Sequence, residues 1–410
     1  MNIWDALLNA FDETSGFYFL FELAFIVLAV KVMGHLSVKI GQPSVFGKLL
    51  VGIILGPSIL NLVHPNPLIS ELAEIGVILL MFLAGLETDF DEFKKNAFAS
   101  TTVAVGGVVL PFIGGYVLAW LFGFETSVAI YVGTLLVATS VSISVQTLRE
   151  LGKLKTREGT TILGAAVLDD VLGIIVLSAV LGLTAGGSSG GWGDLFLVIV
   201  KIIVFFIIAG LIGYYLLPSL LKVMERLQVS QPLLAFAVIV ALLFAYLGEL
   251  FGVAGIVGSY LCGLMLSLTP YREELTHKVE TFSYPFFVSF FFANIGLTAN
   301  FREINTDIIW FSILLAIVAI LGKVFGGALG AKVARFSTSS SFGIGAGMVA
   351  RGEVGLIVAM IGIERGIISN DLFSAALIVV ISSTLVTPPL LKLLMKNGEE
   401  PSTVKSTVQN

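Results

Sequence analysis

The sequence predicts an all-α polytopic membrane protein with about 13 transmembrane helices. Of its 410 residues, 57% are hydrophobic and only 12% are charged, whereas soluble domains carry roughly a quarter charged residues. Apolar runs of about 20 residues, long enough to cross a bilayer as a helix, recur along the whole chain. Lys and Arg also collect in alternate loops between these runs, as in membrane proteins of fixed orientation. Together these observations exclude a soluble globular protein.

The apolar windows are separated by polar, Pro and Gly residues, and they give thirteen candidate spans. They cover approximately residues 17–38, 44–62, 69–87, 97–122, 127–148, 159–185, 194–217, 231–249, 252–268, 281–299, 307–334, 340–364 and 371–395. We therefore expect one transmembrane unit over residues 1–395, with dimerisation and core domains interleaved, and a short polar tail at 396–410. The first sixteen residues contain no Lys or Arg, so they lack the basic region of a cleavable signal peptide.

The loop charges predict the orientation, because cytoplasmic loops collect Lys and Arg. The loops after odd-numbered spans and the C-terminal tail contain Lys39, Lys94, Lys95, Arg149, Lys153, Lys155, Arg157, Lys222, Arg226, Arg272, Lys278, Lys332, Arg335, Lys392, Lys396 and Lys405. The loops after even-numbered spans contain only Arg302 and Arg365. We therefore expect a multi-pass protein of the cell membrane with its N-terminus outside and its C-terminus in the cytoplasm.

An internal repeat appears when the chain is aligned with itself at an offset of about 211 residues. The matching pairs are Gly47/Gly258, Gly52/Gly263, Gly85/Gly296, Phe90/Phe301, Glu92/Glu303 and Gly115/Gly326. The offset maps spans 2–6 onto spans 9–13, which lie seven spans later, so the second copy enters the membrane from the opposite face. Inverted repeats of this kind are typical of secondary transporters, whose binding sites lie near the midplane.

Asp169, Asp170 and Lys323 fall deep inside predicted spans, where each charge costs at least about 2.5–3.5 kcal/mol. Asp169 and Asp170 lie on span 6 and Lys323 on span 11, all about ten residues from the cytoplasmic ends of their spans. Adjacent carboxylates point about 100° apart on a helix. One can therefore face a water-filled cavity while the other faces a neighbouring helix. We expect Asp169 to pair with Lys323.

Spans 5 and 12 are repeat partners, and both read as interrupted helices. Span 5 contains ATSVSISVQT, which includes Thr139 and Ser140, and span 12 contains GMVARGEVG, which includes Arg351 and Glu353. Broken helices at matching repeat positions are the best sequence indication of a transporter's substrate site. Asn294 on span 10 is a candidate to support Asp170 through a hydrogen bond.

A carboxylate in a wet cavity can hold a proton or a small hard cation, but not both together. Oxygen ligands from Asp170, Thr139, Ser140 and unwound carbonyls suit Na⁺. No phosphate-binding, dinucleotide-binding or zinc motif occurs in a usable context, and Cys262 is the only cysteine. The sequence therefore predicts no cofactor, no enzymatic activity and no nucleic-acid partner.

The motifs LDD on span 6, ATSVSISVQTL on span 5, LGKVFGG on span 11 and MVARGEVGLIVA on span 12 together resemble those of bacterial sodium/proton antiporters. The likeness is to the NapA/GerN type of the monovalent cation:proton antiporter 2 group and covers about residues 17–395. It implies a homodimer in which a core domain moves like an elevator against a dimerisation domain. It also implies Na⁺ binding at Asp170, with Asp169 beside it, and Lys323 as ion-pair partner and second proton carrier. An Asp-Asp pair resembles the electrogenic subtype.

Two alternatives remain open at this stage. A sodium-coupled organic-solute symporter can share inverted repeats and crossed, broken helices, but it has no evident need for an Asp-Asp-Lys group. A potassium efflux system of the Kef-like type carries similar motifs and usually an appended sensor domain. The short tail that ends at Asn410 leads us to expect no such domain. The sequence does not decide between Na⁺, Li⁺ and K⁺.

Overall fold

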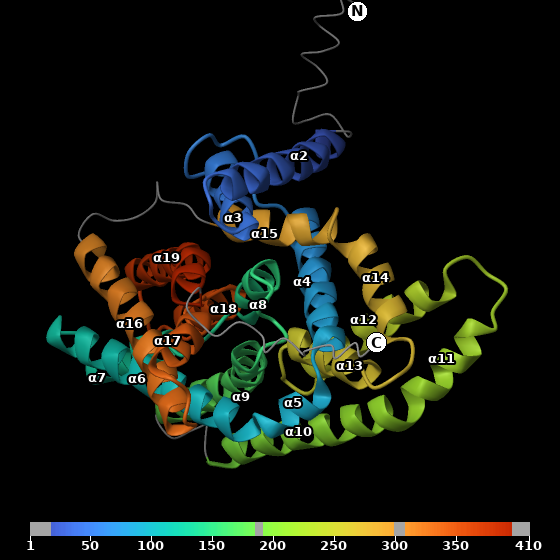
Figure 1. The fold of residues 1–410 in the computed structure, drawn as a ribbon. Coiled ribbons are helices and arrows are strands. Elements are labelled where there is room, and N and C mark those ends of the chain that lie inside the picture. The colour runs from blue at the N-terminus through green and yellow to red at the C-terminus, as the bar shows by residue number, and fades with distance from the viewer. Residues whose placement is uncertain (1–17, 185–191, 299–307, 396–410) are drawn as a thin grey trace, which may run out of the picture. The chain divides into compact units, whose positions relative to one another are not determined.

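The computed structural model describes residues 18–184, 192–298 and 308–395, and every regular element in these ranges is a helix (Figure 1). Eight of the described helices or helix runs are long and apolar enough to cross a membrane. They are α2 (Tyr18–Lys39), α4 (Pro67–Glu87), α6 (Ala97–Leu121), α9 (Arg157–Thr184), the run from α10 (Trp192–Leu211) through the π-helix η1 (Ile212–Leu216) to α11 (Leu217–Glu225), α12 (Pro232–Leu250), α16 (Ile309–Val333) and α19 (Asn370–Met395). The all-helical prediction is confirmed, whereas the count of thirteen spans stays a prediction.

The other predicted windows contain shorter helices. Three of them contain one apolar helix each, namely α3 (Ser44–Leu55), α13 (Gly255–Leu266) and α15 (Phe287–Leu297). In the window at 281–299 the apolar helix α15 begins only at Phe287. Pro285 lies between it and the polar helix α14 (Arg272–Ser283), which ends inside the window. Proline cannot donate the backbone hydrogen bond that a helix interior needs.

Each of the two windows that read as interrupted contains two helices. The first contains α7 (Thr126–Leu135) and α8 (Val141–Glu150), and the second contains α17 (Thr338–Gly347) and α18 (Glu353–Glu364). Residues 136–140 and 348–352 connect the halves; we call these segments the first and the second connection. At the 211-residue offset the two pairs of helices have nearly the same bounds, and α3 and α13 have identical ones.

The chain divides into two compact units that are interleaved in sequence. The first unit comprises Met1–Glu87 and Val204–Thr306, and the second comprises Thr88–Ile203 and Asp307–Asn410. Each unit is built from both halves of the chain.

Glycines allow close helix packing at two related places in the first unit. Gly52 of α3 lies against the backbone of Gly296 on α15, and Gly85 of α4 lies against the backbone of Gly263 on α13. A Cβ atom at any of these positions would collide with the facing backbone. At the 211-residue offset Gly52 corresponds to Gly263 and Gly85 corresponds to Gly296, so the offset maps one contact onto the other.

The second unit is centred on the pair α6 and α16, which lie in contact along their lengths (Figure 1). Gly106 of α6 faces Gly326 of α16, and Gly330 faces the backbone of Thr102. Small residues let two backbones approach in this way inside a membrane protein. The apolar core of the unit includes Tyr131, whose hydroxyl donates to the carbonyl oxygen of Val358 at 2.6 Å. This packing holds α16, and with it Lys323, against the helices that carry the other candidate residues.

Candidate functional site

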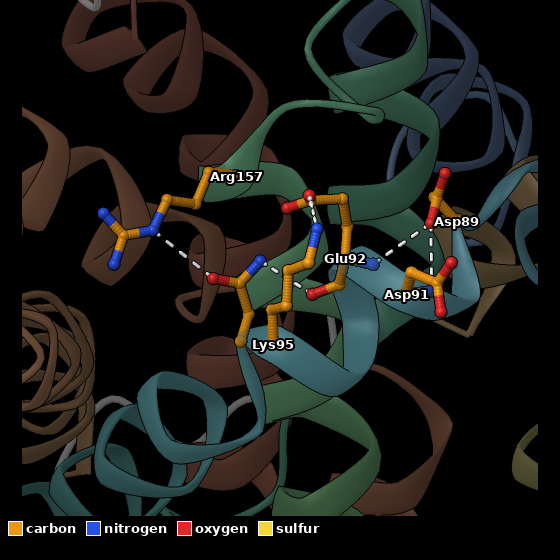
Figure 2. A network of polar contacts seen from close by, with 6 residues as sticks. Asp89, Asp91, Glu92, Lys95 and Arg157 are labelled. Carbon is orange, nitrogen blue, oxygen red and sulfur yellow. Dashed lines mark hydrogen bonds and ion pairs between the residues drawn. The ribbon is translucent and has the colours of Figure 1, made fainter.

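A polar network holds the beginning of α9, the helix that carries the Asp pair (Figure 2). Asp89 caps the short helix α5 (Phe90–Lys95) by accepting hydrogen bonds from the backbone N–H groups of Asp91 and Glu92. Asn96, which follows α5, accepts a hydrogen bond from Nε of Arg157 at 3.3 Å. The guanidinium of Arg157 also lies 4.1 Å from the centre of the Phe336 ring. The first residue of α9 is therefore tied both to the start of α6 and to the segment after α16.

The same network contains a solvent-exposed ion pair. The ammonium group of Lys95 donates to Oε1 of Glu92 at 3.0 Å, one turn back along α5. This hydrogen bond raises the pKa of Lys95. Exposed ion pairs of this kind contribute little to stability. The hydrogen bond between Arg157 and Asn96 is therefore the contact that holds the start of α9.

Lys323 and Asp169 form a fully buried ion pair. The Nζ atom of Lys323 lies 2.9 Å from Oδ1 and 3.1 Å from Oδ2 of Asp169, and both side chains are 0% exposed. Gly107 of α6 lies beside the pair: a Cβ there would be in ordinary van der Waals contact, 3.8 Å from Nζ of Lys323 and 3.9 Å from Oδ1 of Asp169. Desolvating two charges costs several kcal/mol each. The pair therefore need not stabilise the fold, and a role in function would explain its presence.

Asp170 lies on the next position of α9 and is 5% exposed. Gly173, three residues later, shares that side of the helix. A Cβ at Gly173 would lie 3.8 Å from the side chain of Val137, which belongs to the first connection. Asp170 and Gly173 therefore share the side of α9 that packs toward the first connection, while Asp169 is turned toward Lys323.

The two connections meet each other. The backbone N–H of Ser140 donates to the carbonyl oxygen of Ala350 at 2.7 Å, and the hydroxyl of Ser144 donates to that of Gly347 at 2.6 Å. The side-chain hydroxyls of Thr139, Ser140 and Ser142 are buried and have no hydrogen-bond partner among the described residues. A buried polar atom without a partner costs about 1–3 kcal/mol. These oxygens are therefore candidates to bind something other than protein.

Arg351 occupies the second connection and is completely buried. Its guanidinium donates to three backbone carbonyl oxygens, those of Leu136 at 2.7 Å, Val349 at 3.3 Å and Ala319 at 3.4 Å. Leu136 follows the end of α7, where helix carbonyls lack partners and the helix dipole is negative. Arg351 therefore joins the end of α7, the middle of α16 and its own connection.

Sequence reasoning missed one residue of this group. The hydroxyl of Thr384 on α19 donates to the carbonyl oxygen of Arg351. At the 211-residue offset Thr384 corresponds to Gly173, the residue of α9 that lies beside Val137 of the first connection. The run ISSTLVT that contains Thr384 was the available signal, because hydroxyls inside a span need a partner.

The structure does not test two of the predicted site residues. Asn294 lies on α15 in the first unit, so its support for Asp170 stays a prediction. Glu353 is the first residue of α18, and its side chain lies outside the described residues. Within the described ranges, no three His, Cys, Asp or Glu side chains gather into a metal site. Any cation here would be held by one carboxylate together with hydroxyl and carbonyl oxygens.

Comparison with known proteins gives a consistent result. The family model described as "Sodium/hydrogen exchanger, transmembrane" matches residues 23–397. A protein of Bacillus cereus named "Na(+)/H(+)-K(+) antiporter GerN" is 47% identical over 92% of this chain and 96% of its own length. A "Na(+)/H(+) antiporter" of Enterococcus hirae is 38% identical over 91% and 97%, respectively.

The fold comparison agrees. The solved structure of the sodium proton antiporter MjNhaP1 from Methanocaldococcus jannaschii, at 18% identity, covers 95% of this chain and 100% of its own with a TM-score of 0.73. At that identity the likeness concerns the fold alone. The family resemblance of the sequence motifs is confirmed by the family model and by the relatives. The chain belongs to the sodium/hydrogen exchanger family.

Proposed function

We propose that this protein is a secondary antiporter that exchanges a monovalent cation for protons across the cell membrane. The observation that carries the proposal is a group of three parts: the buried Asp169–Lys323 pair, the adjacent Asp170, and the buried hydroxyls of Thr139 and Ser140. These two hydroxyls have no hydrogen-bond partner among the described residues. The names of the relatives, Na(+)/H(+) and Na(+)/H(+)-K(+) antiporters, agree with this chemistry.

Asp170 is the shared site of proton and cation. Its carboxylate can bind a cation when it is charged and loses that ability when it is protonated. Because the two ligands compete, cation binding on one side of the membrane releases the proton there. Thr139 and Ser140 supply hydroxyl oxygens to the same ion, which suits Na⁺ and Li⁺. K⁺ is the third candidate, since the name of one relative includes it.

The test is exchange in liposomes that contain the purified protein and a pH-sensitive dye. Adding Na⁺, Li⁺ or K⁺ in separate runs, without any organic solute, collapses an imposed pH gradient if the protein is an antiporter. Asp170→Asn removes the titratable group at nearly constant volume, so exchange vanishes while the protein still inserts and elutes as the wild type does.

Each alternative has its own outcome in the same assay. A gradient that collapses only when an organic solute is present indicates a sodium-coupled symporter. A pH gradient that collapses with K⁺ but not with Na⁺ or Li⁺ indicates a Kef-like potassium efflux system. Robust Na⁺-dependent proton movement in the Asp170→Asn variant refutes the assignment of the site.

The architecture proposed for this activity has thirteen spans and two inverted repeats, with the N-terminus outside. The exchange of paired glycine contacts at the 211-residue offset supports the repeats, and the loop charges support the orientation. A fluorescent or enzymatic reporter fused after Asn410 is then cytoplasmic, and a Cys introduced at Asn66 reacts with a reagent that cannot cross the membrane. A reporter that is active outside contradicts the orientation and the odd number of spans.

The second unit, which contains the whole candidate group, is the core that moves in an elevator motion. The first unit is the scaffold that forms a homodimer. Cross-linking two cysteines, one in each unit, stops exchange under this mechanism, and reduction restores it. Full exchange in the cross-linked protein excludes the elevator motion.

A further inference from the structure

Gly107 and Pro111 lie one turn apart on α6, so they share the same side of the helix. That side packs against two neighbouring residues of α16. A Cβ atom at Gly107 would lie 3.8 Å from Nζ of Lys323. A Cβ at Gly322, the residue before Lys323, would lie 2.9 Å from Cα of Pro111. The turn of α6 from Gly107 to Pro111 therefore packs directly beside Lys323.

Pro111 changes the hydrogen bonding of this turn. Both Gly107 and Pro111 are buried in the interior of α6. In a regular helix the N–H of each residue donates to the carbonyl oxygen four positions earlier. Proline has no N–H, so Pro111 cannot donate to the carbonyl oxygen of Gly107. That oxygen therefore lacks its usual helical donor, at the turn of α6 that packs beside Lys323.

The ammonium group of Lys323 needs an acceptor whenever it separates from Asp169. Lys323 is 0% exposed, and a buried donor that loses its partner costs free energy. In this structure both oxygens of Asp169 accept from its Nζ atom. Any step of a transport cycle that opens the pair therefore requires a second acceptor within reach of Nζ.

We propose that the carbonyl oxygen of Gly107 is this second acceptor, and that Pro111 is the positioning residue that keeps it available. The inference rests on the proposed antiport function. It adds a resting place for Lys323 once cation binding at Asp170 has opened the pair with Asp169. An amino group donates a hydrogen bond with or without its extra proton, so the assignment does not depend on when Lys323 releases that proton. The pair can thus open without leaving a buried donor alone.

The experiment restores the missing donor. In Pro111→Ala the new N–H at position 111 bonds to the carbonyl oxygen of Gly107 and competes with Lys323. Opening the pair then becomes less favourable, and the apparent affinity falls with the population of the open state. We expect the apparent KM for Na⁺ in liposomes to rise about tenfold, with kcat little changed. Tm in detergent stays at the wild-type value or rises, because alanine suits a helix interior better than proline.

The matched control has lactic acid, the α-hydroxy analogue of alanine, at position 111, introduced by stop-codon suppression in cell-free translation. This chain has the same methyl group as Pro111→Ala, but an ester oxygen replaces the N–H. We therefore expect its KM for Na⁺ to be near the wild-type value. Pro389→Ala removes a proline inside α19, a helix of the same unit, and it leaves KM unchanged.

A second background connects the effect to Lys323. Lys323→Gln has no ammonium group to hold, so adding Pro111→Ala changes KM by no more than about twofold. If α6 instead had to bend at Pro111 during transport, the two changes would act independently and KM would rise by the full factor again. Where exchange by Lys323→Gln is too slow to measure, the same comparison uses the Na⁺ concentration that gives half of the Na⁺-dependent rise in Tm.

A wild-type KM in Pro111→Ala overturns the proposal. Equal values of KM in Pro111→Ala and in the lactic acid chain also overturn it, because the proline ring and not the missing donor then sets the affinity. An undiminished effect of Pro111→Ala in the Lys323→Gln background has the same consequence. If the wild-type protein itself exchanges no cation in these liposomes, the proposed function fails rather than the role of Pro111 alone.

Discussion

Lys323 and Arg351 are two completely buried cations in the same unit, and they are stabilised in different ways. Lys323 bonds to both oxygens of a carboxylate, which can itself change its protonation state. Arg351 bonds to three backbone carbonyls, which cannot. The first arrangement can form and break during a transport cycle, while the second is permanent. The two cations therefore differ in the chemistry of their acceptors and not in their burial.

The internal repeat adds a second contrast at the connections. Arg351 corresponds to Ser140 at the 211-residue offset. One connection therefore contains a buried cation where the other contains hydroxyls that have no hydrogen-bond partner in the described part of the chain. A guanidinium cannot be deprotonated in proteins, and it excludes a second cation from its place. The second connection is therefore held by a guanidinium, whereas the first connection offers buried oxygens to the ion in the function that we propose.

The largest effect on stability is expected for Arg351→Leu. The change removes the donor of three carbonyl oxygens, and each buried carbonyl left alone costs about 1–3 kcal/mol. We expect a marked fall of Tm in detergent, measured by intrinsic fluorescence, and poor recovery of folded protein. Arg351→Lys keeps the charge but cannot reach three acceptors at once. We therefore expect its Tm to lie between those of the wild type and of Arg351→Leu. A Leu variant as stable as the wild type would show that the guanidinium does not hold the connections.

Lys323→Gln is expected to have a smaller effect on stability and a specific effect on transport. Breaking a buried pair costs about 3–5 kcal/mol, but Asp169 can take up a proton and recover part of that loss. We further propose that Lys323 releases its proton when a cation binds, so that two protons exchange for one Na⁺. One net charge then moves per cycle, worth about 2.3 kcal/mol per 100 mV.

The measurement for Lys323→Gln is the exchange rate in liposomes whose membrane potential is set with valinomycin and K⁺. The wild type speeds up with potential, and the variant exchanges at a rate independent of potential. Asp169→Asn combined with Lys323→Gln removes both charges and recovers most of the lost Tm. Equal voltage dependence in the wild type and the variant would exclude Lys323 as the second proton carrier.

The smallest effect on stability is expected for Thr139→Val and Ser140→Ala. Their hydroxyls have no hydrogen-bond partner within residues 18–184, 192–298 and 308–395, so we expect Tm to change by no more than a few degrees. If these oxygens coordinate the ion, however, the apparent affinity for Na⁺ falls about tenfold, a loss of about 1.4 kcal/mol. Thr384→Val serves as the control, because its hydroxyl bonds to the backbone of Arg351; it lowers Tm and leaves Na⁺ affinity near the wild-type value. If Thr384→Val lowered the affinity for Na⁺ while Thr139→Val and Ser140→Ala did not, the binding oxygens would lie at Thr384 rather than in the first connection.

The sequence by itself determined the membrane class, the helical architecture and the neighbourhood of the site. Hydrophobicity along the chain predicts helices because a lipid environment leaves the backbone few other ways to satisfy its hydrogen bonds. The depth of the charges followed from counting: in the structure Asp169 lies 12 residues after the start of α9 at Arg157, and Lys323 lies 10 residues before the end of α16 at Val333. These spacings correspond to about 18 and 15 Å, so the two could be expected to meet.

Only the tertiary structure decided which acceptors satisfy Arg351 and which hydroxyls remain without partners. Backbone carbonyls such as that of Leu136 have no signature in the sequence, since every residue has one. Whether a carbonyl is available depends on where α7 ends and on which helix packs beside it. The same holds for Ser142 and Ser144, two identical residues on one helix: Ser144 meets the end of α17, and Ser142 does not. Their difference is set by the packing of α8, which no local pattern encodes.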